Sequence, residues 1–394
     1  MTNSEGTIGF PAGSLRAMIL CLGIIALIQS VQAQTRVVAW GAGMTVNTSS
    51  EDDWGQSIVP SRLTNAAEVA GGWRQALAVK ADGTVEGWGD DTFGQTNLPP
   101  TNNYAAVASG ELFCLALETN GTVVGAGDDA YGQIDVPANL TNAVAATCGF
   151  YHCLALKADG TLAAWGGTED SPDYEGTVPP GVSNVVAISA GGYHNLVLKS
   201  DGTLFAWGEN SGYGETNIPA GLSNVIAIAA GGWHNLALKA DGTVFAWGLN
   251  TSNQATVPVG LSNVVAVAAG SYHSLALKSN GTVVAWGENT EGDTIVPVNL
   301  TNVDQIAAGD VNSLALTNSS PPMTHALLTT PKLGTNGFSV LVPTQNGRVY
   351  QLEYESSLTN GVWQTLPLHA GTGKMLRLTD PAAATQRYYR VMRW

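Results

Sequence analysis

Apolar and polar residues alternate along most of this chain, in a unit that recurs seven times. The clearest copy, residues 224–248, reads NVIAIAAGGWHNLALKADGTVFAWG. Each copy has an Asn seven positions before a Gly, and successive copies start 38 to 42 residues apart. Alternation with a period of two and many β-branched residues predict strands. A repeat of this length predicts the blades of a β-propeller or the units of another solenoid.

Four strands are expected in each unit: VIAIAA, HNLALK, TVFAWG and a short fourth that ends at Val-Pro or Ile-Pro, as at Ile218-Pro219. An Asp-Gly or Asn-Gly pair between the second and third strands predicts a tight hairpin. The chain enters with a third and a fourth strand, residues 36–41 and 58–60, and the repeats end with a first and a second, residues 303–316. We therefore predict an all-β fold with a seven-bladed β-propeller, closed by N-terminal strands that complete the last blade.

The repeated phrase AAGxxHxLALKxDGTVxAWGxN resembles the repeats of the regulator of chromosome condensation family, over residues 36–316. The Val-Pro linkers and the short exported format look closest to the secreted bacterial propeller that inhibits β-lactamases by binding them. The resemblance implies the propeller fold. It implies no single function, because similar propellers serve as nucleotide exchange factors, inhibitors and adhesion modules.

The N-terminus has the pattern of a signal peptide. Arg16 precedes an apolar run, residues 17–28, and Val31-Gln32-Ala33 is a small-x-small cleavage sequence. We expect residues 1–33 to be removed and the mature protein to be secreted, whether extracellular, periplasmic or at the cell surface. Twelve apolar residues are too few to span a bilayer, so no transmembrane segment is expected.

The repeats give way at about residue 320 to a linker and then to strand-like runs between residues 338 and 394. We divide the mature chain into a propeller, residues 34–324, and a C-terminal β module, residues 325–394, that reads as a small β-sandwich. A structural cap is the favoured role for this module, and contact with a cell surface is the alternative.

Charge is divided unevenly between these parts. Residues 34–324 hold 27 acidic and 8 basic side chains, whereas residues 325–394 hold 3 acidic and 7 basic. The propeller should therefore repel nucleic acid phosphates, which argues against a chromatin role and against nucleic acid as a partner.

Polar residues that recur in the repeat read as structural. The histidines His152, His194, His234 and His273 fall at one repeat position, where hydrogen bonds to neighbouring backbone would satisfy them. Their spacing is not that of metal ligands, and no catalytic motif appears, so we expect no cofactor, no metal site and no enzyme. Three cysteines remain after cleavage. The sequence does not decide whether Cys148 and Cys153 form a disulfide.

Strand parity places two sets of loops on one face. In an antiparallel blade the loop between strands one and two and the loop after strand three emerge at the same end. The three-to-four loops carry Trp54, Phe93, Tyr131, Tyr174 and Tyr213, and the one-to-two loops carry Trp73, Tyr151, Tyr193, Trp233 and Tyr272. The same loops hold 19 of the 27 acids and one basic residue, Arg74. We call this surface the aromatic face.

Exposed aromatic rings among Gly, Asn and Ser are typical of protein-binding surfaces. The sequence thus predicts a secreted, non-enzymatic propeller that binds a protein through the aromatic face, in the manner of an inhibitor. The partner is unidentified, and a basic one would suit the charge. The alternatives are a glycan-binding or cell-surface adhesion module and an enzyme with its site at the propeller mouth.

Overall fold

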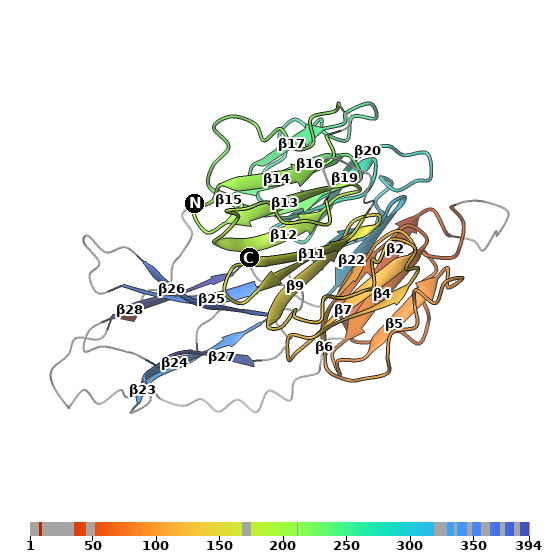
Figure 1. Ribbon diagram of the computed structural model, residues 1–394. Helices are drawn as coiled ribbons and strands as arrows, with labels where there is room; N and C mark the ends of the chain where they lie inside the picture. The colour runs from red at the N-terminus through yellow and green to blue at the C-terminus, as the bar shows by residue number, and fades with distance from the viewer. Residues whose placement is uncertain are drawn as a thin grey trace.

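The computed structural model describes residues 8–9, 35–44, 52–167, 175–210, 212–318, 329–334, 337–344, 349–355, 363–370, 375–381 and 387–393. Within these residues seven antiparallel sheets of three strands follow one another along the chain (Figure 1). The predicted all-β propeller fold is confirmed. The predicted signal peptide lies outside the described residues, except that Ile8 and Gly9 pair with Tyr389 and Tyr388. No helix in the described part is long and apolar enough to cross a membrane.

Each sheet is one blade, numbered here 1 to 7 in the chain order of its first strand. The first strands are β3 (Ala66–Gly71), β6 (Tyr104–Ser109), β9 (Ala143–Cys148), β12 (Val185–Ala190), β15 (Val225–Ala230), β18 (Val264–Ala269) and β21 (Val303–Ala308). The second strands are β4 (Gln75–Lys80), β7 (Phe113–Glu118), β10 (His152–Lys157), β13 (His194–Lys199), β16 (His234–Lys239), β19 (His273–Lys278) and β22 (Asn312–Thr317). The third strands are β5 (Val85–Gly89), β8 (Val123–Gly127), β11 (Leu162–Gly166), β14 (Leu204–Gly208), β17 (Val244–Gly248), β20 (Val283–Gly287) and, in blade 7, β2 (Arg36–Gly41).

Blade 7 joins the two ends of the repeat array. Strand β2 pairs with β22 along its whole length, from Arg36 opposite Thr317 to Gly41 opposite Asn312. On its other side blade 7 reaches blade 1, where the N–H of Asp310 donates to the carbonyl of Gly72 at 3.1 Å. The last blade therefore lies beside the first.

The structure has three strands in each blade and not the predicted four. The segment expected as the fourth strand runs beside the third without joining the sheet. Its N–H groups bond within local turns, as from Val136 to the carbonyl of Ile134 at 2.9 Å, and the proline that follows has no N–H to donate. A Cβ on Gly125 of β8 would lie 2.8 Å from the side chain of Ile134, so the glycine admits this close approach.

The hairpins between second and third strands form as predicted. In the turn of blade 5, Gly242 has a φ of 81°, which glycine adopts without strain. The carboxylate of Asp241 accepts hydrogen bonds from the N–H and the hydroxyl of Thr243, at 3.0 and 2.6 Å. The recurring Asn that begins each repeat has its own conformational role, since Asn224 has a φ of 58° and Asn tolerates this left-handed region.

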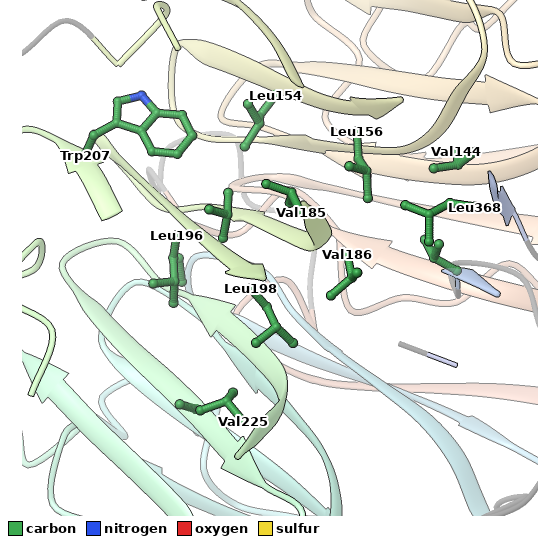
Figure 2. Packing of buried hydrophobic residues seen from close by; sticks show 14 of the residues in the cluster. Val144, Leu154, Leu156, Val185, Val186, Leu196, Leu198, Trp207, Val225 and Leu368 are labelled. Atoms are coloured by element: carbon green, nitrogen blue, oxygen red, sulfur yellow. The ribbon is translucent and has the colours of Figure 1, made fainter. Parts of the chain in front are cut away.

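The second strand of each blade is its core, because five of its six residues are buried in all seven blades. Leucines from these strands pack between blades, as Leu154, Leu196 and Leu198 do in the largest cluster (Figure 2). The tryptophans that recur near the end of the third strands also pack between blades. Trp247, for example, is buried and donates its indole N–H to the carbonyl of Glu215 at 3.0 Å.

The recurring histidines bond to side chains of the next blade, which corrects the expectation that neighbouring backbone satisfies them. Nε2 lies 2.8 to 3.1 Å from a side-chain oxygen in the pairs His152–Asn195, His194–Asn235, His234–Ser274 and His273–Ser313. Each acceptor residue also donates to a carbonyl of its neighbour blade, as Ser274 does to Gln254 at 2.9 Å. We call this contact the inter-blade latch. The side-chain partner comes from the next blade because each histidine lies at the contact between two blades.

The latch is absent where the repeat departs from its consensus. Blade 2 has Phe113 in place of the histidine, and it faces blade 3, where Cys153 replaces the polar acceptor. Cys114, Cys148 and Cys153 are all buried free thiols, so Cys148 and Cys153 do not form a disulfide in this structure. Cys153 instead lies with its Sγ 3.2 Å from the carbonyl oxygen of Gln133.

The C-terminal strands form two sheets. One has β23 (Thr329–Gly334), β24 (Gly337–Pro343) and β27 (Met375–Asp380), and the other has β1 (Ile8–Gly9), β28 (Tyr388–Arg393), β25 (Val349–Glu355) and β26 (Gln364–Ala370). A shared core with Phe338, Leu378 and Tyr350 joins the two sheets. Strand β26 reaches the propeller, where the N–H of Leu368 donates to Ala158 at 2.9 Å and the side chain packs near Val144 (Figure 2). Ala158 follows β10 at the end of blade 3 opposite the aromatic face.

Candidate functional site

The two predicted sets of loops converge on one face. The ring of Tyr131, from a loop after a third strand, lies 4.8 Å from the ring of Tyr151, from a loop between first and second strands. The guanidinium of Arg74 likewise lies over Trp54 of one set at 5.3 Å and over Trp73 of the other at 3.6 Å. Residues more than 15 positions apart in the sequence are thus brought into one surface by the propeller.

The aromatic rings form a continuous band over blades 3 to 6. Tyr151 lies 5.9 Å from Tyr193, and Trp233 lies 5.0 Å from Tyr272. Phe150 connects the two pairs, at 5.4 Å from Tyr193 and 5.5 Å from Trp233. The sequence analysis missed Phe150, although it stands where the copies in blades 4 and 5 have glycine, and that departure from the repeat was a usable signal.

The band combines accessible and half-buried rings. Phe93, Tyr131 and Tyr213 are 51%, 45% and 51% exposed. The other predicted rings that the structure describes are half-buried: Trp54, Trp73, Tyr151, Tyr193, Trp233 and Tyr272. The remaining predicted residue, Tyr174, lies outside the described residues. Half-buried rings held by their neighbours offer rigid contact area, because little side-chain entropy remains to be lost on binding.

Trp73 belongs to a different repeat position from the rings with which the sequence analysis grouped it. Trp73 follows Gly72 directly and so corresponds to Phe150, whereas Arg74 corresponds to Tyr151. Arg74 occupies its place by stacking on Trp73, which is a cation–π contact. The face therefore has a second cluster, Trp54, Trp73 and Arg74, outside the band.

Acidic groups gather between this cluster and the band. Burial raises the pKa of Glu111, while a hydrogen bond from the Tyr151 hydroxyl and the nearby charge of Arg74 lower it. Burial, together with the nearby carboxylates of Asp52, Glu111, Asp293 and Glu288, raises the pKa of Asp310 to about 7. Burial also raises the pKa of Asp293 to about 6. The face thus concentrates negative charge that its own groups neutralise only in part.

The buried histidines are unsuited to acid–base chemistry at neutral pH. Burial lowers the pKa of His152 and His234 to about 3 and that of His273 to about 4, so the rings are neutral. Nδ1 of His273 lies 3.2 Å from the carboxylate of Asp293, but both groups lie inside the inter-blade contact. Over the described residues, no group of three or more His, Cys, Asp or Glu side chains has an arrangement that could hold a metal ion.

Comparison with known proteins identifies the repeat. The family model for the regulator of chromosome condensation (RCC1) repeat matches residues 185–215, 225–254 and 264–293, in blades 4 to 6. The chain contains repeats of the regulator of chromosome condensation family. A curated relative, Protein pim1 of Schizosaccharomyces pombe, is 25% identical over 150 residues, which cover 36% of this chain and 25% of that protein. The match thus spans a quarter of the relative's length.

Solved structures of such propellers match over most of this chain. Prp20p of Saccharomyces cerevisiae is 18% identical with a TM-score of 0.58, over 74% of this chain and 93% of that chain. The ectodomain of the receptor kinase CR4 of Physcomitrella patens is 22% identical with a TM-score of 0.55, over 67% of this chain and 75% of that one. At these identities the likeness shows the fold. Propellers of these repeats are generally protein-binding or regulatory modules.

Proposed function

We propose that this chain is a secreted propeller that binds another protein through the aromatic face, without catalysing a reaction. The observation that carries the proposal is the continuous ring contact from Tyr131 through Phe150 to Tyr272 on a surface rich in carboxylates. Interface cores are enriched in aromatic residues, and such rings supply most of the binding energy when a partner excludes water from them.

The charge of the face suits a basic partner. Glu111 and Asp310 lie beside the rings on this face, and burial raises the pKa of both carboxyl groups, so ionising them there is costly. A positively charged surface placed against them would relieve that cost and would speed association at low salt.

Related propellers also act by binding proteins. The structural study of Prp20p addressed its binding to Gsp1p and histones, and yeast Prp20 has been crystallised bound to Kap60. Only binding to a protein is carried over from these propellers to this chain. Its acidic face and the signal-like residues 1–33 favour a different partner. A β-lactamase is one specific candidate, on the resemblance to the secreted bacterial inhibitor.

The test compares three proteins that span residues 34–394: wild type, a face variant and a control variant. The face variant changes Phe93, Tyr131 and Tyr213 to Ala, since these exposed rings contribute little to the fold. The control changes the exposed Phe245, Val259 and Val298, which lie off the aromatic face, to Ala. Each is immobilised and exposed to secreted proteins, to a purified β-lactamase and to isolated envelope glycan, at low and high salt.

We expect a protein that wild type and the control variant retain, that the face variant loses, and that high salt weakens. Equal retention by the face variant would show that binding uses another surface. Salt-insensitive retention of glycan would favour the adhesion module, because stacking of sugars on rings depends little on ionic strength. Chemical conversion of one of these added materials by the wild type would favour the alternative that the chain is an enzyme.

A further inference from the structure

The first strands of the seven blades line a central channel of about 350 Å³. Its wall consists mostly of glycine, alanine, valine and isoleucine, and Ala370 of β26 contributes to it from the C-terminal module. Leu368 anchors that strand at the end of blade 3 opposite the aromatic face. The other mouth of the channel therefore opens in the aromatic face.

The rim of this mouth is asymmetric. In each blade the rim position is the residue that follows the recurring Gly of the one-to-two loop. These residues are, in blade order, Trp73, Glu111, Phe150, Gly192, Gly232, Ser271 and Asp310, and all of them line the channel. Because blade 7 lies beside blade 1, Asp310, Trp73, Glu111 and Phe150 follow one another around the rim. Two carboxylates thus alternate with two aromatic rings.

Backbone hydrogen bonds tie two of these four residues to the neighbouring blade. The N–H of Asp310 donates to Gly72 in blade 1 at 3.1 Å, and the N–H of Trp73 donates to Gly110 in blade 2 at 3.4 Å. Asp310 and Trp73 are thus each positioned by a bond to the glycine that precedes the next rim residue.

The charges that act on Asp310 are all of one sign. Within the described part of the chain these are the carboxylates of Asp52, Glu111, Asp293 and Glu288, and Asp310 also raises the pKa of the Tyr272 hydroxyl. Arg74 acts on Glu111 but lies stacked on Trp73. The mouth therefore keeps negative charge in a half-buried position, which costs free energy unless a cation binds there.

A buried polar side chain behind Asp310 also lacks partners. Asn312 is fully buried, and neither its side-chain oxygen nor its side-chain nitrogen has a hydrogen bond. It occupies the latch position of blade 7, but the residue that faces it in blade 1 is Ala76, which has no polar atom. Its Oδ1 lies against Gly309, which lines the mouth; a Cβ on that glycine would be 2.1 Å away. The blade 7 to blade 1 contact beneath the rim therefore lacks the latch that joins the regular blades.

We propose that the channel mouth binds one lysine or arginine side chain of the protein partner, with its charged head between Asp310 and Glu111 and against the rings of Trp73 and Phe150. The inference rests on the proposed protein-binding function and names the chemistry that its centre recognises. Aromatic faces attract ammonium and guanidinium groups, and flanking carboxylates add direct charge pairing. The acid pair also explains why the rim departs from the repeat at these two blades.

The test uses small probes, so that it does not depend on finding the partner. N-acetyl-lysine methylamide, N-acetyl-arginine methylamide and the neutral N-acetyl-norleucine methylamide are titrated into the full mature chain, and the indole N–H resonances are followed by NMR. We expect saturable, salt-sensitive binding of a cationic probe and none of the neutral one. The relative affinity of the lysine and arginine probes shows which side chain the mouth prefers.

Two variants sharpen the test. Asp310→Asn with Glu111→Gln should weaken the cationic probe at least about tenfold. Asp159→Asn with Asp201→Asn, in hairpin turns on the opposite face, should leave it unchanged. Equal binding of the norleucine probe, unchanged binding by the rim variant, or no saturable binding of either cation would overturn the inference. If the partner is lost with the Phe93, Tyr131 and Tyr213 variant but kept by the rim variant, the protein-binding function stands and the cation site does not.

Discussion

Blades 3 to 6 and the junction of blades 7, 1 and 2 are built from the same repeat, but different side chains join neighbouring blades in the two regions. In the first region each blade binds the next through a histidine latch, as at His234 and Ser274. At the junction the latch residues are replaced, and Asn312 is left facing Ala76. The carboxylates of the channel rim occur only in this second region. The regular blades thus hold one another through histidine latches, whereas the junction lacks them and carries the two rim carboxylates of the proposed cation site.

The largest difference between the two regions should come from truncating a latch. His234→Ala removes a fully buried ring and its hydrogen bond, and we expect a loss of about 3 kcal/mol in the free energy of unfolding. Asn312→Ala removes a buried side chain without hydrogen bonds and should cost less than about 1 kcal/mol. Urea unfolding of both variants measures the difference. Equal losses would show that the two regions do not differ in stability.

The next effect is the pH dependence of the latched region. The folded pKa of His152 and His234 is about 3, below the ordinary value of 6.5, so the folded state binds fewer protons than the unfolded state between these values. Stability is therefore full above pH 6.5 and falls as the pH drops, by up to about 1.4 kcal/mol per pH unit for each histidine. Asp293 and Asp310, with raised pKa values, oppose this trend but are outnumbered by the four histidines.

A double variant isolates one histidine. His234→Phe with Ser274→Cys copies the pairing of Phe113 with Cys153 that joins blades 2 and 3. We expect this variant to lose less stability than wild type between pH 6 and pH 4, with similar stability at pH 8. Parallel curves for the two proteins would mean that His234 does not control the acid sensitivity.

Sequence reasoning found the features that local pattern encodes. Period-two alternation and the Asp-Gly pair located the strands and turns, and strand parity placed both loop sets on one face. Sequence reasoning failed for the repeated histidines, whose hydrogen-bond partners lie in another blade. Asn195 follows His152 by 43 positions, so their contact exists only after the blades pack. The prediction of a fourth strand in each blade was wrong, because the alternating pattern does not reveal that the N–H groups of this segment bond within local turns.

The third prediction concerns the junction. Asp310→Asn removes a carboxylate whose ionisation is opposed by burial and by like charges, so it should stabilise the protein by about 1 kcal/mol at pH 8. The gain should disappear below about pH 4, where the carboxyl is protonated in both states. The matched change Asp159→Asn should alter stability by less than about 0.5 kcal/mol, since Asn120 makes the same turn contact in blade 2. Destabilisation by Asp310→Asn at pH 8 would assign Asp310 a structural role.

The smallest effect on stability should come from the exposed rings. Phe93→Ala and Tyr213→Ala remove side chains that are 51% exposed, so each should change the free energy of unfolding by less than about 1 kcal/mol. Trp207→Ala, in the buried cluster between blades, should cost about 3 kcal/mol or more. Thermal and urea unfolding of the three variants measure this contrast. A large loss from Phe93→Ala would mean that the ring supports its loop, and any loss of binding by that variant would then reflect a disturbed fold. A small loss, together with lost binding, would mean that the ring is held at the surface for a partner.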